Sequence, residues 1–129
     1  MEAAEVCLFR ASVLLEQRSF EALERTLREC PPGDDWSAQN QAVWARLQTQ
    51  ADLSSGRGDR ALERIDQALQ ANPRDLDLHR DRARVLLILG RLGEARIETR
   101  FVLRRHPDDP GAQAILRQIE RTEAGNRTE

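Results

Sequence analysis

Residues 56–65 read Gly56-Arg57-Gly58-Asp59-Arg60-Ala61-Leu62-Glu63-Arg64-Ile65, and a matching sequence begins 34 residues later with Gly90-Arg91-Leu92-Gly93-Glu94-Ala95-Arg96. Five landmarks keep this spacing: Gly56 with Gly90, Ala61 with Ala95, Ala68 with Val102, Leu69 with Leu103, and Pro73 with Pro107. A fixed internal period of this length is typical of chains built from one repeated unit of secondary structure.

The landmarks have local structural reasons. Gly56 and Gly90 follow apolar helical sequence, where the turn that ends a helix favours a residue tolerant of positive φ. Pro73 and Pro107 end the next helix, because proline disfavours helical geometry in the residue before it. Between Gly56 and Pro73 lies one apolar helical stripe, formed by Ala61, Leu62, Ile65, Ala68 and Leu69. Each unit is therefore a pair of helices.

A weaker copy lies upstream. Ala22, Leu23, Thr26 and Cys30 repeat the internal spacing of Ala61, Leu62, Ile65 and Leu69. Ala22 precedes Ala61 by 39 residues, so we expect about five extra residues in the loop-like sequence 31–35.

These patterns predict an all-α chain of about seven helices. The expected ranges are 3–17, 20–30, 37–54, 59–71, 75–89, 92–105 and 110–123. We expect Asp34 or Asp35 to cap the third helix, Asp59 the fourth, and Asp108 or Asp109 the last. Ala114, Ile115 and Ile119 should form the buried side of the last helix.

The sequence resembles the tetratricopeptide repeat (TPR) family, whose units are 34-residue helix hairpins. The matching positions are Ala83, Gly90, Ala95, Val102 and Pro107 in one unit, and Gly56, Ala61, Ala68 and Pro73 in the unit before. His79 and Ala45 stand where the family prefers a large aromatic residue, and Asp52 and Leu86 where it often has Tyr. The resemblance implies a right-handed superhelical stack of antiparallel hairpins, an α-solenoid.

The resemblance also implies a domain organisation of about three repeats and a capping helix. We expect a single domain over 1–124, followed by a flexible tail at 125–129. Within the domain we expect a degenerate repeat at 3–36, clearer repeats at 37–74 and 75–108, and a capping helix at 109–123.

The sequence favours neither an enzyme nor a metal or cofactor protein. The only histidines are His79 and His106, and no phosphate loop, nucleophile motif or spaced ligand pair is present. The net charge of −2 argues against a general nucleic-acid binder. The longest apolar run, 85–89, is far shorter than the roughly 20 residues that span a bilayer.

The N-terminus shows no signal peptide, so we expect a cytoplasmic protein, the alternative being a domain of a longer exported chain. All twenty basic residues are Arg and none is Lys, which favours a GC-rich bacterial genome. Cys7 and Cys30 are too few for a zinc site or a disulfide framework. We expect both to be buried as small apolar side chains; the alternative is a bridge between the first two helices.

Stacked TPR hairpins present a concave surface lined by the first helix of each pair. Carried over by resemblance, this surface contains Arg46, Gln50 and Leu53 from one unit and Arg80, Arg84, Leu87 and Ile88 from the next. Guanidinium groups beside apolar side chains suit a partner peptide with acidic groups or a free C-terminal carboxylate. The sequence therefore predicts a module that binds a partner protein.

Several alternatives stay open at this point. Arg80 could pair with Asp77 or Asp81, and Arg84 with Asp81, which would make an ordinary solvated helix face. The exposed ends of the stack could join copies of the chain into a self-assembling scaffold or homo-oligomer. The chain could also be a chaperone or a regulatory subunit of a larger secretion or enzyme system. The clamp of heat-shock co-chaperones is disfavoured, because it uses Lys and this chain has none.

Overall fold

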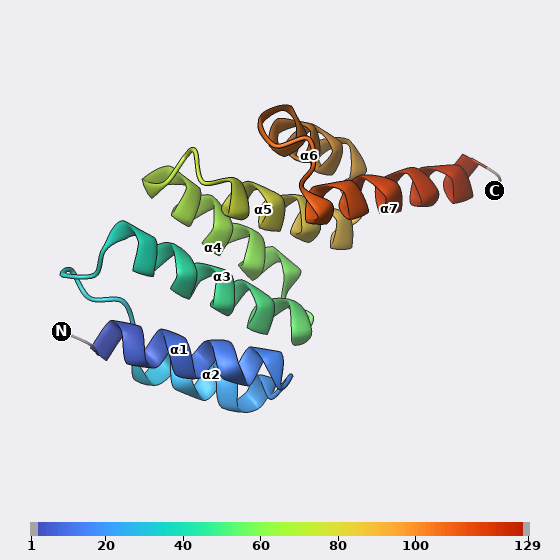
Figure 1. The fold of residues 1–129 in the computed structure, drawn as a ribbon. Coiled ribbons are helices and arrows are strands. Elements are labelled where there is room, and N and C mark those ends of the chain that lie inside the picture. Colours follow the sequence, from blue (N-terminus) through green and yellow to red (C-terminus); the bar gives the residue numbers. More distant parts are fainter. Residues whose placement is uncertain (1–2, 128–129) are drawn as a thin grey trace. The chain divides into compact units, whose positions relative to one another are not determined.

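The computed structural model describes residues 3–127, and its secondary structure in that range is helical throughout (Figure 1). The helices are α1 (Ala3–Glu16), α2 (Phe20–Glu29), α3 (Ala38–Ser54), α4 (Gly58–Ala71), α5 (Leu76–Ile88), α6 (Leu92–Arg105) and α7 (Pro110–Arg127). The predicted all-α fold with about seven helices is confirmed over these residues. A search of the same residues finds no helix with the length and apolar character that a membrane span needs.

The chain divides between Pro73 and Arg74 into two compact units. The first unit contains α1 to α4, and the second contains α5 to α7. The division lies one residue before the predicted boundary between the second and third repeats, which is between residues 74 and 75. The single domain over 1–124 stays a prediction.

In the first unit, α1 pairs with α2, α3 pairs with α4, and α3 packs on both helices of the first pair. The buried residues of their shared core are Leu8, Ala11, Leu23, Leu27, Leu47 and Ala51. Each fully buried leucine stabilises the fold by about 1.5–3 kcal/mol. The alanines have short side chains, which let neighbouring helices approach closely at those positions.

The turns after α1, α3 and α5 share one hydrogen-bond pattern. The backbone N–H groups of Ser19, Arg57 and Arg91 donate to the carbonyl five residues earlier, at 2.9, 2.8 and 2.9 Å. The residue before each donor has a positive φ: 56° at Arg18, 75° at Gly56 and 79° at Gly90. This is the Schellman ending of a helix, in which glycine is preferred at the positive φ.

These turns fix the register of the first hairpin. Arg18 is equivalent to Gly56, 38 residues later, and buried Leu23 is equivalent to buried Ala61. The predicted separation of 39 residues, counted from Ala22, is therefore wrong by one. The first hairpin is four residues longer than the 34-residue repeat, because 38 less 34 is four.

In the second unit, α5 and α6 form a hairpin and α7 packs on both helices. Leu78, Leu86 and Val102 are fully buried there. In α7 the buried residues are Ala112, Ile115 and Ile119, whereas Ala114 is exposed, so the predicted core position at 114 is wrong.

The C-terminal helix is also longer than predicted. Helix α7 continues through Arg127, so residues 125–127, which we assigned to a flexible tail, are helical. The rest of that tail, 128–129, lies outside the described residues.

The helix caps confirm one of the predicted positions. Asp109 Oδ1 accepts from the Ala112 N–H at 2.9 Å at the start of α7, as predicted. Helix α3 is capped instead by Ser37, whose Oγ accepts from the Asn40 N–H at 3.0 Å. Asp59 lies inside the first turn of α4, one residue beyond its start at Gly58, where its charge still favours the helix N-terminus.

The expectation that Cys7 and Cys30 are separate buried thiols is wrong. The structure joins them in a disulfide between α1 and the end of α2, with Cα atoms 6.5 Å apart. That separation lies within the usual range for disulfides. The alternative of a bridge between the first two helices therefore describes this structure.

Candidate functional site

The predicted residues Arg46, Gln50 and Leu53 share one side of α3, within about 60° when residues are placed 100° apart around the axis. Each is half-buried. Leu47 and Ala51, which pack in the core against residues of α1 and α2, lie on another side of the same helix. The structure therefore keeps these predicted residues together, away from the core.

Arg80 has a different place from the one the predicted site requires. Its Nη2 donates to Asp77 Oδ1 at 2.7 Å and its Nη1 donates to Asp109 Oδ2 at 2.7 Å. Its side chain is only 19% exposed and lies against the first turn of α7, where a Cβ at Gly111 would come within 2.7 Å of Arg80 Cδ. Arg80 thus links α5 to α7.

The carboxylate of Asp109 pairs with Arg80 and also caps the N-terminus of α7. The hydrogen bond from the Ala112 N–H lowers the pKa of Asp109, and the charge of Arg80 lowers it further against the effect of desolvation. Asp109 therefore stays charged to a lower pH than an ordinary Asp, and the start of α7 is bound to α5 by a charge-assisted contact.

Arg84, Leu87 and Ile88 form the outward part of the predicted α5 face. Arg84 Nη1 donates to Asp81 Oδ1 at 3.3 Å, while 38% of its side chain stays exposed and Asp81 is nearly fully buried. Leu87 is half-buried and Ile88 is 58% exposed. The pairings Arg80–Asp77 and Arg84–Asp81, left open in the sequence analysis as the alternative to a ligand site, are both present.

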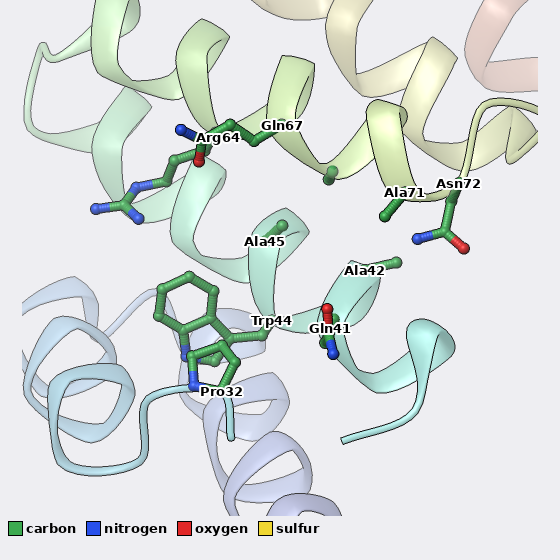
Figure 2. Close-up of a pocket in the computed structure, with 10 residues that line it drawn as sticks. Pro32, Gln41, Ala42, Trp44, Ala45, Arg64, Gln67, Ala71 and Asn72 are labelled. Atoms are coloured by element: carbon green, nitrogen blue, oxygen red, sulfur yellow. The ribbon is translucent and has the colours of Figure 1, made fainter. Parts of the chain in front are cut away.

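Sequence analysis missed a cleft within the first unit, between α3, α4 and the loop that follows α2. It encloses about 170 Å³. Its lining combines small apolar side chains with amides, one indole and one guanidinium: Pro32, Gln41, Ala42, Trp44, Ala45, Arg64, Gln67, Ala68, Ala71 and Asn72. Figure 2 shows Trp44 and Arg64 toward one end and Asn72 with Ala71 toward the other. A regular spacing of alanines on facing helices was the available signal.

One end of this cleft is fixed by a buried carboxylate. Asp52 is fully buried on α3, and its Oδ2 accepts from Arg64 Nε at 2.9 Å. Its Oδ1 accepts from Arg57 Nη2 at 3.3 Å, and that same Nη2 donates to Glu24 Oε1 at 2.5 Å. The hydrogen bond from Arg57 lowers the pKa of Glu24, with a further contribution from Ser55. Two carboxylates and two guanidiniums therefore neutralise one another at this end.

Trp44 forms the aromatic wall of the cleft. The guanidinium carbon of Arg64 lies 5.5 Å from the centre of its ring, within the range of a cation–π contact. The indole Nε1 is buried without a hydrogen-bond partner among the described residues. A volume of this size has room for one side chain.

His79 belongs to a packed polar cluster in the second unit. Its Nδ1 contacts Glu98 Oε1, and Arg82 Nη1 donates to Glu98 Oε2 at 2.7 Å. Its ring lies 4.2 Å from that of Phe101, centre to centre. This arrangement ties α5 to α6. Among the described residues no group of three or more His, Cys, Asp or Glu side chains could hold a metal ion.

Comparisons with known proteins agree with this architecture. A family model described as tetratricopeptide repeat matches residues 52–119. A solved structure of the Hsp90 co-chaperone Cns1 from Saccharomyces cerevisiae matches with a TM-score of 0.81 at 18% identity, over 98% of this chain and 41% of that one. The chain thus spans about two fifths of the co-chaperone's length.

The TPR domain of OM64 from Arabidopsis matches with a TM-score of 0.75 at 16% identity, over 95% of this chain and 98% of that domain. Both identities are low, so these likenesses concern the fold. No match is found among curated protein sequences.

Proposed function

The chain belongs to the tetratricopeptide repeat family, and on that premise we propose that it is a protein–protein interaction module without enzymatic activity. In the second unit it binds a segment of a partner protein through the outward side of α5, at Arg84, Leu87 and Ile88; Arg80, one turn earlier, is held by Asp77 and Asp109. In the first unit, Arg46, Gln50 and Leu53 on α3 form a candidate face of their own.

The observation that carries this proposal is the combination of side chains at the outward face of α5. Ile88 is 58% exposed and shares a helix face with Leu87 and with the partly exposed side chain of Arg84. Exposed apolar side chains next to a charged donor are typical of an interface that combines a hydrophobic anchor with a polar contact.

The charges define the kind of segment that fits this face. Asp81 already accepts from Arg84, and Asp77 and Asp109 already accept from Arg80. A carboxylate of the partner would therefore share Arg84 with Asp81 and gain little from Arg80. The apolar contacts to Leu87 and Ile88 should provide most of the affinity, and an acidic group or free C-terminus should orient the segment.

A carboxylate clamp of the heat-shock type is not expected in this chain. The heat-shock co-chaperones of the family hold a terminal carboxylate with Lys and Asn residues. This chain contains no Lys and has Gln50 where an Asn would be expected. We therefore propose a different partner from the one in that protein's name.

A pair of matched variants tests the proposal. Ile88 and Ile97 are both exposed isoleucines of the second unit, but Ile97 lies on α6 and outside the proposed site. Affinity purification with quantitative mass spectrometry should recover a partner with the wild-type chain and with Ile97→Glu, and lose it with Ile88→Glu. Equal recovery with both variants would show that this face of α5 is not the binding site.

A further inference from the structure

Helix α1 carries an apolar face that no described residue covers. Phe9 is 73% exposed and Val6 is 48% exposed, although both lie in a regular helix. The two residues form a shallow hollow together with Arg10, Val13 and Leu14, all from α1. Exposed apolar patches on a small protein mark surfaces that contact another molecule.

The shared turns explain why this face is apolar. With Arg18 equivalent to Gly56, Phe9 corresponds to Leu47 and Val13 corresponds to Ala51, each 38 residues later. Leu47 is 5% exposed and Ala51 is fully buried, because α3 uses this face to pack on the α1–α2 hairpin. Helix α1 thus has the same packing face as α3, with no preceding hairpin among the described residues to receive it.

The last helix of a second copy does not suit this face. The outward residues of α7 are mostly charged or carry amides, namely Ala114, Arg117, Gln118, Glu120 and Arg121. Burying Val6 and Phe9 against them would desolvate polar groups without returning hydrogen bonds. A head-to-tail contact between copies is therefore disfavoured.

The α1 face is complementary to itself. Val6, Phe9 and Val13 are spaced three and then four residues apart, which places Val6 and Val13 at a and Phe9 at d of a coiled-coil heptad. Glu5 then occupies g and Arg10 occupies e, and these are the positions that pair across a parallel coiled coil.

We propose that two copies of this chain associate through a parallel pairing of their α1 helices. Phe9 of each copy packs on the apolar face of the other, and Glu5 of each copy pairs with Arg10 of the other. The interface is isologous, because the same patch serves both copies. This self-association is separate from the partner binding proposed for α5.

The charges favour the parallel orientation over the antiparallel one. In an antiparallel pair the two e positions face each other, as do the two g positions, so Arg10 would meet Arg10 of the second copy. Arg10 is exposed and has no ion-pair or hydrogen-bond partner among the residues of the described range. Glu5 accepts from Asn40 Nδ2 at 3.1 Å through Oε1, which leaves Oε2 for the second copy's Arg10.

The interface is small, so the dimer should be reversible. A single pair of short helices buries less than the ~800 Å² per partner that is usual in stable complexes. Analytical ultracentrifugation over a wide concentration range should show a monomer–dimer equilibrium for the wild-type chain. Phe9→Glu should weaken it at least ~30-fold, the usual effect of losing an anchoring aromatic residue.

Ile97→Glu is the matched control, since it also replaces an exposed apolar residue with Glu, on α6. It should leave the equilibrium unchanged. Phe9 is mostly exposed, so Phe9→Glu should fold normally, which circular dichroism checks. A chain that stays monomeric at all concentrations, or a dimer that survives Phe9→Glu, would overturn the proposal.

Charge reversal tests the orientation. Arg10→Glu and Glu5→Arg should each weaken the homodimer, because like charges then meet at both pairs. Mixing the two variants should restore association, since one chain then carries two acidic side chains at these positions and the other carries two basic ones. If the mixture associates no better than either variant alone, the parallel pairing is excluded.

Discussion

Asp52 and Arg64 join the two helices of the second hairpin, with Arg64 Nε 2.9 Å from Asp52 Oδ2 and no solvent exposure at the carboxylate. Thirty-four residues later the position of Asp52 is occupied by Leu86, which is also fully buried. Equivalent sites in consecutive hairpins are therefore filled once by an ion pair and once by a hydrocarbon.

This equivalence predicts that Asp52→Leu is tolerated. Arg57 and Arg64 are each about a third exposed and can turn to water when the carboxylate is gone. Removing the carboxylate therefore leaves no buried unpaired charge, and only the long hydrogen bond from Gln48 is lost besides, so the free energy of unfolding should change by less than about 1 kcal/mol. Chemical denaturation measures this change.

Arg64→Ala should be far more damaging than Asp52→Leu. It removes the shortest hydrogen bond to the buried carboxylate and leaves only longer ones, from Arg57 Nε and Nη2 at 3.3 Å and from Gln48 Nε2 at 3.4 Å. It also removes the guanidinium that lies over the Trp44 ring. We expect a loss of roughly 2–4 kcal/mol. The reverse order of the two variants would contradict the view that Asp52 depends on Arg64.

Arg18 is expected to limit the stability of the first hairpin. It has a φ of 56° in a turn whose counterparts are Gly56 and Gly90. The left-handed region costs about 1–2 kcal/mol for a residue with a side chain. Arg18→Gly should therefore raise the free energy of unfolding by about 1 kcal/mol, less a small loss of contact between Arg18 and the Phe20 ring.

Gly56→Ala is the companion variant and should lower stability by a similar amount. No atom lies within 4 Å of a Cβ at Gly56, so the penalty isolates the backbone conformation. Thermal denaturation of both variants beside the wild type gives the comparison; a destabilised Arg18→Gly would show that the arginine contributes more than its backbone costs.

Asp109 should make stability depend on acid pH. Its pKa is lowered in the folded state by the Ala112 N–H and by Arg80. A lowered folded pKa stabilises the protein above the unfolded pKa, about 3.9, and this contribution is lost as pH falls through the folded value. Asn caps helices about as well as Asp, so Asp109→Asn isolates the effect of the charge.

The wild type should exceed Asp109→Asn in stability by about 1 kcal/mol at neutral pH. This difference should shrink as pH falls below about 4. Urea denaturation at several pH values measures it, and the comparison cancels contributions from Glu5 and Glu24, whose pKa values are also lowered. A difference that is constant with pH would exclude the charged contact.

The disulfide between Cys7 and Cys30 gives a further prediction. It closes a loop of sequence separation 23, and the entropy model assigns about 3 kcal/mol to loops of such a size. Reduction, or the double variant Cys7→Ser/Cys30→Ser, should lower the free energy of unfolding by about that amount. Titration under denaturing conditions should detect no free thiol before reduction.

The same titration on protein taken directly from cells bears on location. Disulfides persist mainly in oxidising compartments, whereas the sequence predicts a cytoplasmic protein. Free thiols in freshly extracted protein would support the cytoplasmic prediction.

The well-spaced repeats made much of the fold predictable. Gly56 and Gly90 mark turns, and Pro73 and Pro107 mark helix ends, for reasons that are local in the sequence. Their spacing therefore predicted the bounds of α4, α5 and α6 accurately. The first hairpin was harder, because Arg18 takes the place of the expected glycine and gives no sequence signal of a positive φ. That absence accounts for the one-residue error in register.

The candidate site was less predictable than the fold. The sharing of one helix face by Arg84, Leu87 and Ile88 follows from helical periodicity alone. The contact of Arg80 with Asp109 does not, because it joins residues 29 positions apart and depends on how α7 packs. The α3–α4 cleft likewise depends on the distance between two helices, which alanine spacing suggests but does not determine.

Gly111 has a consequence for how the C-terminal helix stays attached. It leaves Arg80 just enough room to reach Asp109, since one additional carbon would collide with the arginine at 2.7 Å. A methyl group at this position would force the Arg80 side chain to move and would weaken the hydrogen bond that holds the start of α7 on α5. The attachment of the last helix therefore depends on a position that carries no side chain.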